Sequence, residues 1–306
     1  MNKVETKDLL ADASNSEFIF RDKIDIDTKE TFGLEIEFED VKLNDIKYDR
    51  HWDIKKDDTV TNYIGGYEVG GEAASPILKD TIECWKDVNH MCSYLIKKGA
   101  NATEKTGAHI HIGSQILGDN PNNIRKFLKE WELFEDAIYQ FSYGKDTLAR
   151  KQINSQAYHV SKTLYKIRNS KSGYNSYKTY YDWLNFFKKY KLIKFSGVNF
   201  SNYKGSEEDI GNTVEIRCPN GTVDAVIWQN NINFFTKFLS YASSNRYDEE
   251  YIDYLLKNKN LDNSYVSIET ALNLADMVFE NRTDKIMFLK QCLKLFDNNK
   301  EYVKKK

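Results

Sequence analysis

Three short segments place ionisable side chains at alternating positions, with apolar residues between them. They are Glu35 and Glu37 in FGLEIEF, His109 and His111 in GAHIHIG, and Glu215 and Arg217 in TVEIRC. Alternate residues of a β-strand project from the same face, so each pair would stand on one side of its strand. If the three strands are neighbours, one face of a sheet presents carboxylates, imidazoles and a guanidinium together.

This set of side chains favours the binding of cations and phosphate. Glu68 and Glu72, in a glycine-rich segment, raise the number of acids to five. Five carboxylates in one cleft repel one another unless cations neutralise them, and oxygen-rich sites with an imidazole suit Mg²⁺ or Mn²⁺ better than zinc. Arg217 fits a bidentate clamp on a phosphate group. Each pair alone also fits a solvated strand face or a structural pair, but repetition on three strands favours a shared site.

The elements that must position these residues can be predicted from periodicity. Strict alternation predicts strands over 31–40, 107–113 and 212–218, and the last is expected to form a hairpin with 195–203. Apolar residues at helical spacing predict helices in the stretches 78–98 and 124–143, and a helical region from Asp224 onward. Together they predict an α+β fold with a mostly antiparallel sheet and helices against one face.

Composition excludes several classes of protein. The 306 residues contain 44 Lys+Arg and 46 Asp+Glu, a formal net charge of −2, which argues against a general nucleic-acid binder. No apolar run is long enough for a membrane span, and the first residues show no secretory signal. The four cysteines lack metal-binding spacing. The sequence therefore predicts a cytoplasmic protein with reduced cysteines.

Four blocks together resemble a known family. They are FGLEIEF (32–38), EAASP (72–76), GAHIHIG (107–113) and TVEIRCPNGT (213–222). In order and spacing they resemble the amidoligase family, carboxylate–amine ligases related to glutamine synthetase and glutamate–cysteine ligase. The resemblance implies a glutamine-synthetase-like fold: a curved antiparallel sheet that holds ATP and divalent metal ions on its concave face, with helices on the outer face and a helical C-terminal region.

The resemblance also implies roles for individual residues. Metal binding is implied for Glu35, Glu37, Glu72, His109 and Glu215. Arg217 would face the transferred phosphoryl group, and His111 and Arg150 would contact the nucleotide or its phosphates. Asp58, in WDIKKDD, would lie near the substrate amine, where it or Glu72 could accept a proton. Glu68 is a weaker candidate for the position given to Glu72.

These roles imply an ATP- and Mg²⁺-dependent ligase that joins a small-molecule or peptide carboxylate to an amine through an acyl phosphate. The alternative is a non-catalytic structural or binding protein that retains the fold, for example in a virion or a cell envelope. A zinc amidohydrolase is disfavoured, because only His159 of the five histidines follows the HxH pair.

The sequence also divides into three regions. It predicts a polar N-terminal arm (1–30), an amidoligase-like catalytic domain (31–246) and a helical C-terminal extension (247–306). Within the catalytic domain, the Tyr-, Lys- and Ser-rich stretch 161–194 contains one predicted helix with flanks typical of a mobile loop. It is expected to be either a lid over the site or a solvated loop.

Overall fold

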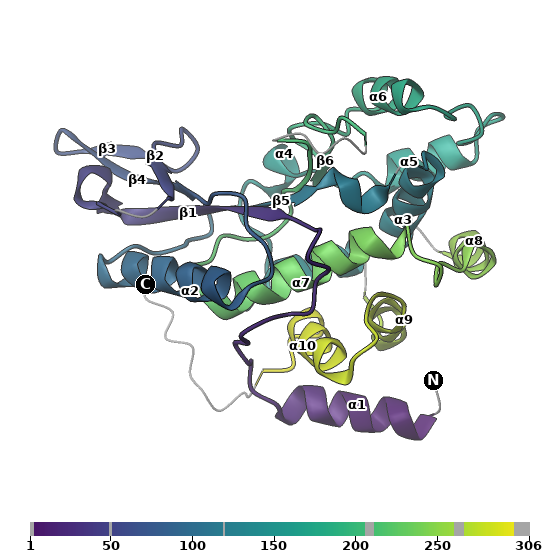
Figure 1. Ribbon diagram of the computed structural model, residues 1–306, viewed down its shortest axis with the longest axis horizontal. Coiled ribbons are helices and arrows are strands. Elements are labelled where there is room, and N and C mark those ends of the chain that lie inside the picture. Colours follow the sequence, from purple (N-terminus) through teal and green to yellow (C-terminus); the bar gives the residue numbers. More distant parts are fainter. Residues whose placement is uncertain (1–2, 49–50, 119, 206–210, 260–265, 297–306) are drawn as a thin grey trace.

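A computed structural model describes residues 3–48, 51–118, 120–205, 211–259 and 266–296 (Figure 1). Within these residues the chain forms ten α-helices and a seven-stranded sheet. The strands are β1 (Phe32–Lys42), β2 (Asp53–Lys55), β3 (Asn62–Ile64), β4 (Tyr67–Ala74), β5 (Ala108–Gly113), β6 (Val198–Asn199) and β7 (Thr213–Ile216). The helices are α1 (Lys3–Asn15), α2 (Ile82–Lys97), α3 (Asn122–Ser142), α4 (Ile153–Gln156), α5 (Ser161–Arg168), α6 (Tyr180–Lys189), α7 (Ala225–Tyr241), α8 (Glu249–Asn258), α9 (Ile268–Val278) and α10 (Arg282–Cys292).

The sheet is antiparallel and open, which confirms the coarse form of the predicted fold. Its strands follow the order β2-β4-β1-β5-β7-β6, and β3 pairs with β4 beside β2. In this register Glu35 lies opposite His109, and Glu37 lies opposite Glu72. His111 lies opposite Glu215 across the next pair of strands. Because residues opposite each other on neighbouring strands share a face, the register places the predicted site residues on one side of the sheet.

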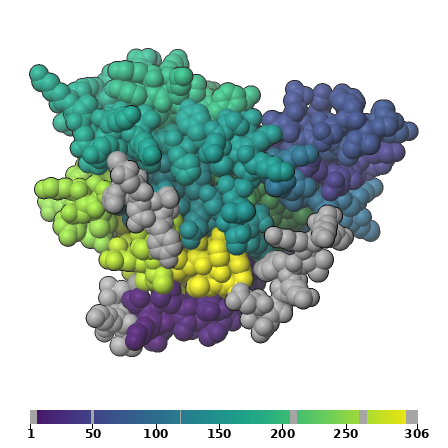
Figure 2. Space-filling view, turned by 180° about the vertical axis from the view of Figure 1, so that it is seen from behind, coloured from purple at the N-terminus to yellow at the C-terminus, as the bar shows by residue number. Residues whose placement is uncertain are grey.

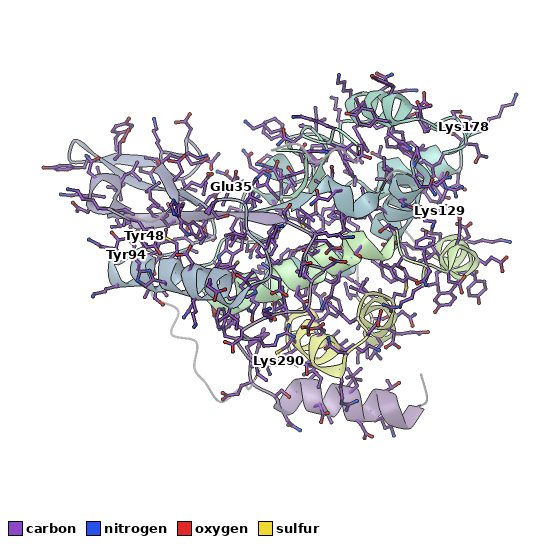
Figure 3. All side chains as sticks on the ribbon, viewed as in Figure 1. Glu35, Tyr48, Tyr94, Lys129, Lys178 and Lys290 are labelled. Atoms are coloured by element: carbon purple, nitrogen blue, oxygen red, sulfur yellow. The ribbon has the colours of Figure 1, made fainter. Side chains whose placement is uncertain are left out.

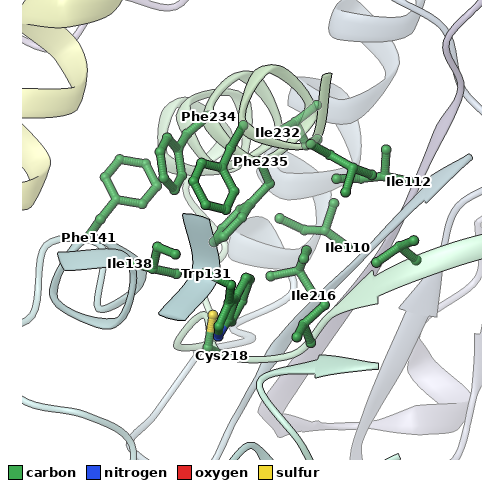
Figure 4. Close-up of a cluster of buried hydrophobic side chains, with 14 of the residues drawn as sticks. Ile110, Ile112, Trp131, Ile138, Phe141, Ile216, Cys218, Ile232, Phe234 and Phe235 are labelled. Atoms are coloured by element: carbon green, nitrogen blue, oxygen red, sulfur yellow. The ribbon is translucent and has the colours of Figure 1, made fainter. Parts of the chain in front are cut away.

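The other face of the sheet is the apolar core. Ile36, Ile110 and Ile112 are fully buried there, and α2 and α7 run beneath this face (Figure 1). Figure 4 shows Ile110, Ile112 and Ile216 in one cluster with Ile232 and Phe235 of α7, and Phe234 of α7 beside Phe141 of α3. In FGLEIEF and GAHIHIG, the apolar residues therefore pack against the helices, and the charged residues between them face the candidate site.

The α2 helix illustrates how local sequence sets the elements under the sheet. Thr81 caps its N-terminus by accepting a hydrogen bond from the Cys84 backbone N–H at 3.1 Å. Gly99, just past its end, has φ +89°, a conformation that favours glycine. Trp85 is fully buried and stacks on Phe32 of β1 at 5.6 Å between ring centroids. The cap sets where α2 begins, and the Trp85–Phe32 contact holds α2 against β1.

Residues 161–194, here named the lysine-rich arm, contain the predicted helix as α6, and the stretch before it, expected to be a loop, contains a second helix, α5. The arm contains two helices, α5 and α6, and buries aromatic side chains such as Trp183 and Phe186. Two fully buried glutamates of α3 hold it. Glu135 accepts the backbone N–H groups of Val160 and Ser161 at the start of α5, at 2.6 and 2.9 Å, and Glu132 pairs with Arg168 at its end.

Both ends of the described chain join the helical layer below the sheet. The opening segment, expected to be a polar arm, forms α1, which lies along α10 and buries Leu9 and Ala13. Helix α8 packs on α3, and α9 and α10 pack on α3 and α7. The domain limits at residues 30 and 246 stay predictions. No helix in the described ranges is long and apolar enough to span a membrane.

Candidate active site

Glu35 lies at the centre of the polar face of the sheet (Figure 3). Its two carboxylate oxygens bond to two imidazoles, His109 Nδ1 at 2.8 Å and His111 Nε2 at 3.0 Å. Burial alone would raise the pKa of Glu35, but the hydrogen bonds to His109 and His111 outweigh it and lower the pKa. Burial would lower the pKa of His111, and its bond to Glu35 together with the charge of Glu215 raises it. This carboxylate therefore stays ionised between two imidazoles.

Glu37 and Glu72 form the acidic side of the same cluster. Both are nearly fully buried, and Glu37 Oε2 accepts the Gly107 backbone N–H at 2.5 Å. Glu72 Oε1 forms an ion pair with Lys55 Nζ at 3.0 Å and has no other partner among the described residues. Burial and the charge of Glu35 raise the pKa of Glu72, against the effect of Lys55. Glu72 therefore accepts a proton more readily than Glu35 does.

Both carboxylate oxygens of Glu215 are bound by side chains of the sheet. Arg217, two residues along β7, forms an ion pair with one of its oxygens, and Asn199 Nδ2 of β6 donates to the other at 2.6 Å. The remaining bond of the Arg217 guanidinium runs to the Gln156 carbonyl at 3.4 Å. Glu215 and Arg217 thus neutralise each other in this structure, and a ligand that binds either of them must share that pair.

Arg150 enters the site from the segment before α4. It is 4% exposed, its guanidinium donates to the Arg217 carbonyl at 3.0 Å, and its Nε has no hydrogen-bond partner in the described part of the chain. Gly107 makes room for it, because a Cβ at that position would lie 1.5 Å from Arg150 Nη1. Burial lowers the pKa of Arg150, while the charge of Glu37 opposes this effect. A buried guanidinium of this kind suits an anionic ligand.

Two cavities meet at Glu35. The first, of about 280 Å³, is strongly charged, and its walls include Glu37, Glu72, His109, Arg150, Arg217, Asp57, Lys105 and Lys194. The second, of about 340 Å³, has apolar and uncharged polar walls apart from Glu35 and His111. These walls include Phe32, Leu34, Pro76, Ile77, Gln115, Asn202 and Asn212. Glu35 belongs to both walls, so a ligand that spans the two cavities would pass this carboxylate.

The donor set fits a divalent cation. Single ligand atoms of Glu35, Glu72 and His109 lie within 4.8 Å of one another, and so do those of Glu35, His111 and Glu215. Buried polar atoms are normally hydrogen-bonded, yet Glu72 Oε1 and His109 Nε2 have no such partner among the described residues. His109 Nε2 instead lies 3.6 Å from Glu37 Oε1. These two atoms and the surrounding carboxylates are the oxygen and imidazole ligands that Mg²⁺ or Mn²⁺ accepts, and a cation that bound Glu72 Oε1 would compete with its ion pair to Lys55.

Three of the predicted residues do not line either cavity. Glu215 lies next to them, paired with Arg217 and grouped with Glu35 and His111, whereas Asp58 and Glu68 lie apart. The Asp58 side chain is 90% exposed and pairs with Lys56 at 3.1 Å, whereas its neighbour Asp57 lines the charged cavity. Glu68 lies on the β3–β4 hairpin, where it accepts a hydrogen bond from the Tyr63 hydroxyl at 2.7 Å. Glu72 is therefore the better placed of the two glutamates from β4.

Several side chains of the site were missed by sequence reasoning. Lys55 lies opposite Glu72 in the β2–β4 ladder, and Asn199 stands opposite Glu215 on β6. Lys55 could have been predicted from WDIKKDD only if the pairing of β2 with β4 had been known. Asn199 lies in a strand of two residues, which is too short to show a pattern.

The chain belongs to the amidoligase family. Residues 28–239, more than half of its length, match the family model described as "Putative amidoligase enzyme". Among solved structures, it is similar to the crystal structure of a bifunctional glutathione synthetase from Pasteurella multocida, with a TM-score of 0.41 and 12% sequence identity. That match covers 96% of this chain and 48% of the other, so this chain spans about half the length of that protein. Comparison with curated proteins gives no match.

Proposed function

We propose that this chain is an ATP-dependent carboxylate–amine ligase on a glutamine-synthetase-like sheet. One observation carries the proposal: the carboxylates Glu35, Glu37 and Glu72 and the imidazole of His109 line a single cavity together with two buried arginines. Acids and arginines in one cavity suit a metal–phosphate complex, because each component needs the charge of the other. Glu35, Glu37, Glu72, His109 and Glu215 would hold Mg²⁺ or Mn²⁺, and the bound cations would neutralise charge on the phosphates.

The two cavities suggest how the nucleotide would lie. The larger one combines an apolar wall with amide side chains such as Gln115 and Asn202, a surface suited to an uncharged base and sugar. His111 stands where this cavity meets Glu35. The phosphates would then extend past Glu35 toward Arg150 and Arg217 in the charged cavity.

The first proposed step transfers a phosphoryl group. A substrate carboxylate oxygen attacks the γ-phosphorus, the bond to the bridging oxygen breaks, and ADP leaves with that electron pair. Arg217 and Arg150 would stabilise charge on the transferring group, which is mostly a matter of position and electrostatics. Both guanidiniums are already buried and held by backbone carbonyls, so little reorganisation is needed.

The second proposed step forms the amide. The amine attacks the acyl carbon, phosphate leaves, and a carboxylate takes the proton from the nitrogen. Glu72 would suit this role at a stage when it does not bind a cation, because burial and the charge of Glu35 then raise its pKa and make it a better proton acceptor than an ordinary glutamate. Asp58 would need to turn from solvent into the cavity to do the same.

The proposal is tested by thermal unfolding with Mg²⁺ and ATP, and by assay of ADP and phosphate release over carboxylate and amine pairs. A ligand at about 100 times its Kd adds about 2.7 kcal/mol of stability, so a clear shift is expected. It should be lost in Glu35→Gln and Arg217→Ala and kept in Glu83→Gln, an exposed control on α2. If the wild-type protein showed neither a shift nor ADP release, the non-catalytic alternative would replace the ligase.

A further inference from the structure

The lysine-rich arm concentrates positive charge that the whole-chain composition conceals. Within 161–194 there is one acid, Asp182, against Arg168 and eight lysines: Lys162, Lys166, Lys171, Lys178, Lys188, Lys189, Lys191 and Lys194. The arm therefore carries +8, and with −2 for the whole chain the remainder carries −10. A surface so uneven favours an anionic partner at the arm and repels it elsewhere.

The described part of the chain offers these lysines no acidic partner in an ion pair. All eight are exposed, and no ion pair of theirs is found among the residues that the structure describes. The single acid of the arm is already occupied, because Asp182 closes a capping box at the start of α6 with Thr179. Arg168 likewise pairs with the buried Glu132. The exposed charge is thus available to a ligand.

Helices α5 and α6 hold several of these lysines on their solvent-exposed faces. In α5, Lys162, Tyr165 and Lys166 lie on the face opposite the buried Leu164 and Ile167. In α6, Tyr181 and Lys188 lie opposite the buried Trp183 and Phe186, and Tyr181 is 74% exposed. Tyrosine beside lysine offers apolar contact and hydrogen bonds as well as charge.

The arm leads to the charged cavity. Figure 3 shows Lys178 at the outer end of the arm, away from Glu35, and Figure 2 shows the segment as one continuous layer on that side of the molecule. At the other end of the arm, Lys194 and the adjacent Phe195 line the cavity itself. A ligand lying along the arm would therefore reach the residues proposed to activate a carboxylate.

We propose that the lysine-rich arm docks an acidic polypeptide, one carboxylate of which enters the charged cavity as the substrate of the ligase. This inference rests on the proposed function, since the reaction consumes a carboxylate. A polypeptide rich in glutamate or aspartate supplies both the charge for the arm and the reacting group, whereas the backbone of a nucleic acid supplies only the charge. The acidic remainder of the chain confines such a polymer to the arm.

Direct binding tests the proposal without turnover. A fluorescein-labelled peptide of about ten glutamates is titrated with the full chain in the absence of ATP and metal, at about 50 and about 300 mM NaCl. The peptide should bind, and high salt should weaken it by about tenfold or more. The triple variant Lys162→Glu, Lys166→Glu and Lys188→Glu should weaken it by about tenfold or more, because each exposed charge pair contributes modestly and three are reversed.

The controls separate docking from charge and from folding. The triple variant Lys79→Glu, Lys86→Glu and Lys97→Glu changes the same net charge with exposed lysines at or near α2, and it should change binding less than about twofold. Substitution of the three arm lysines by Gln provides a milder set, and the thermal midpoint shows whether each variant is folded. Equal loss in both Glu triples, or tighter binding of an oligonucleotide of equal charge, would overturn the proposal.

The same measurements distinguish this proposal from the ligase itself. Glu35→Gln should keep peptide binding while it loses the ATP and Mg²⁺ stabilisation. If the peptide binds through the arm but no acid supports ADP release, the ligase reaction is refuted and docking remains. If small acids are ligated but the peptide fails to bind, the docking surface is refuted and the ligase remains.

Discussion

Glu130, in the middle of α3, is a buried carboxyl group that the proposed chemistry does not use. It is 0% exposed, and neither of its oxygens has a hydrogen-bond partner among the described residues. Burial raises the pKa of Glu130 well above its usual range, and only the charge of Lys126 opposes this. The group is therefore protonated in the folded protein at pH values where it is ionised in the unfolded chain.

Replacement of Glu130 by Met should stabilise the protein, and the gain should grow with pH. An unpartnered polar group in the core costs about 1–3 kcal/mol, which the similarly sized apolar side chain removes. Because the folded pKa is raised, the wild-type protein loses stability as pH rises above the unfolded pKa of about 4.3. The loss is about 1.4 kcal/mol per pH unit until the folded carboxyl also ionises.

Urea unfolding of both proteins between about pH 5 and pH 8 measures this difference. Glu135→Gln, on the same helix, is a matched comparison with the opposite sign. Burial would raise the pKa of Glu135, but His159, Ser161 and Val160 outweigh it and lower the pKa. Its stabilisation is therefore present above the unfolded pKa and lost only as pH falls through the folded pKa.

Glu135→Gln should thus destabilise by about 1–3 kcal/mol, with little change over the pH range in which Glu130→Met gains. Two outcomes would refute the reasoning about Glu130. One is an advantage of Glu130→Met that does not change with pH, which would mean that the carboxyl is not held protonated. The other is destabilisation at about pH 8, which would mean that the ionised group has partners in the folded state.

Two further substitutions test the site. Gly107→Ala should displace the Arg150 guanidinium, because the new Cβ would lie 1.5 Å from Nη1. We expect the rate of ADP release to fall more than about tenfold while the urea midpoint changes modestly. Unchanged activity would show that Arg150 does not position the phosphates. Lys55→Met removes the half-exposed ammonium 3.0 Å from Glu72. Divalent cations, titrated by thermal shift, should then bind up to about fivefold more tightly, since such a pair is worth up to about 1 kcal/mol. Weaker binding would mean that Lys55 supports the site.

The sequence predicted the polar face of the sheet because strand alternation is a local signal. Glu35, Glu37, His109 and His111 needed only period-2 spacing to share a face, and the apolar residues between them had to be buried. The pairing of Glu37 with Glu72 was harder, since it depends on how β4 is aligned with β1. That alignment includes a register shift after Phe38, which no local pattern shows.

Other features were out of reach because they depend on distant partners. The sequence predicts a polar arm where α1 forms, because the short stripe of apolar residues in α1 is buried against α10, far along the sequence. The lysine-rich arm resembled a loop because Glu132 and Glu135, which hold α5, look like surface acids of α3 in the sequence. In both cases the stabilising contact joins two segments that are far apart in the sequence. The periodicity of one segment does not indicate which other segment it packs against.

The register of the sheet also explains why the two cavities can act together. Glu35 lies on β1, between β4 and β5, and it bonds to both imidazoles. It also belongs to both groups of side chains whose ligand atoms could hold a cation. A nucleotide in one cavity and a carboxylate in the other would therefore meet the same side chain. Its depressed pKa keeps it an acceptor throughout, so both histidines stay oriented, and His109 Nε2 stays directed at the acids. One ionised residue thus fixes the geometry on either side of the proposed reaction.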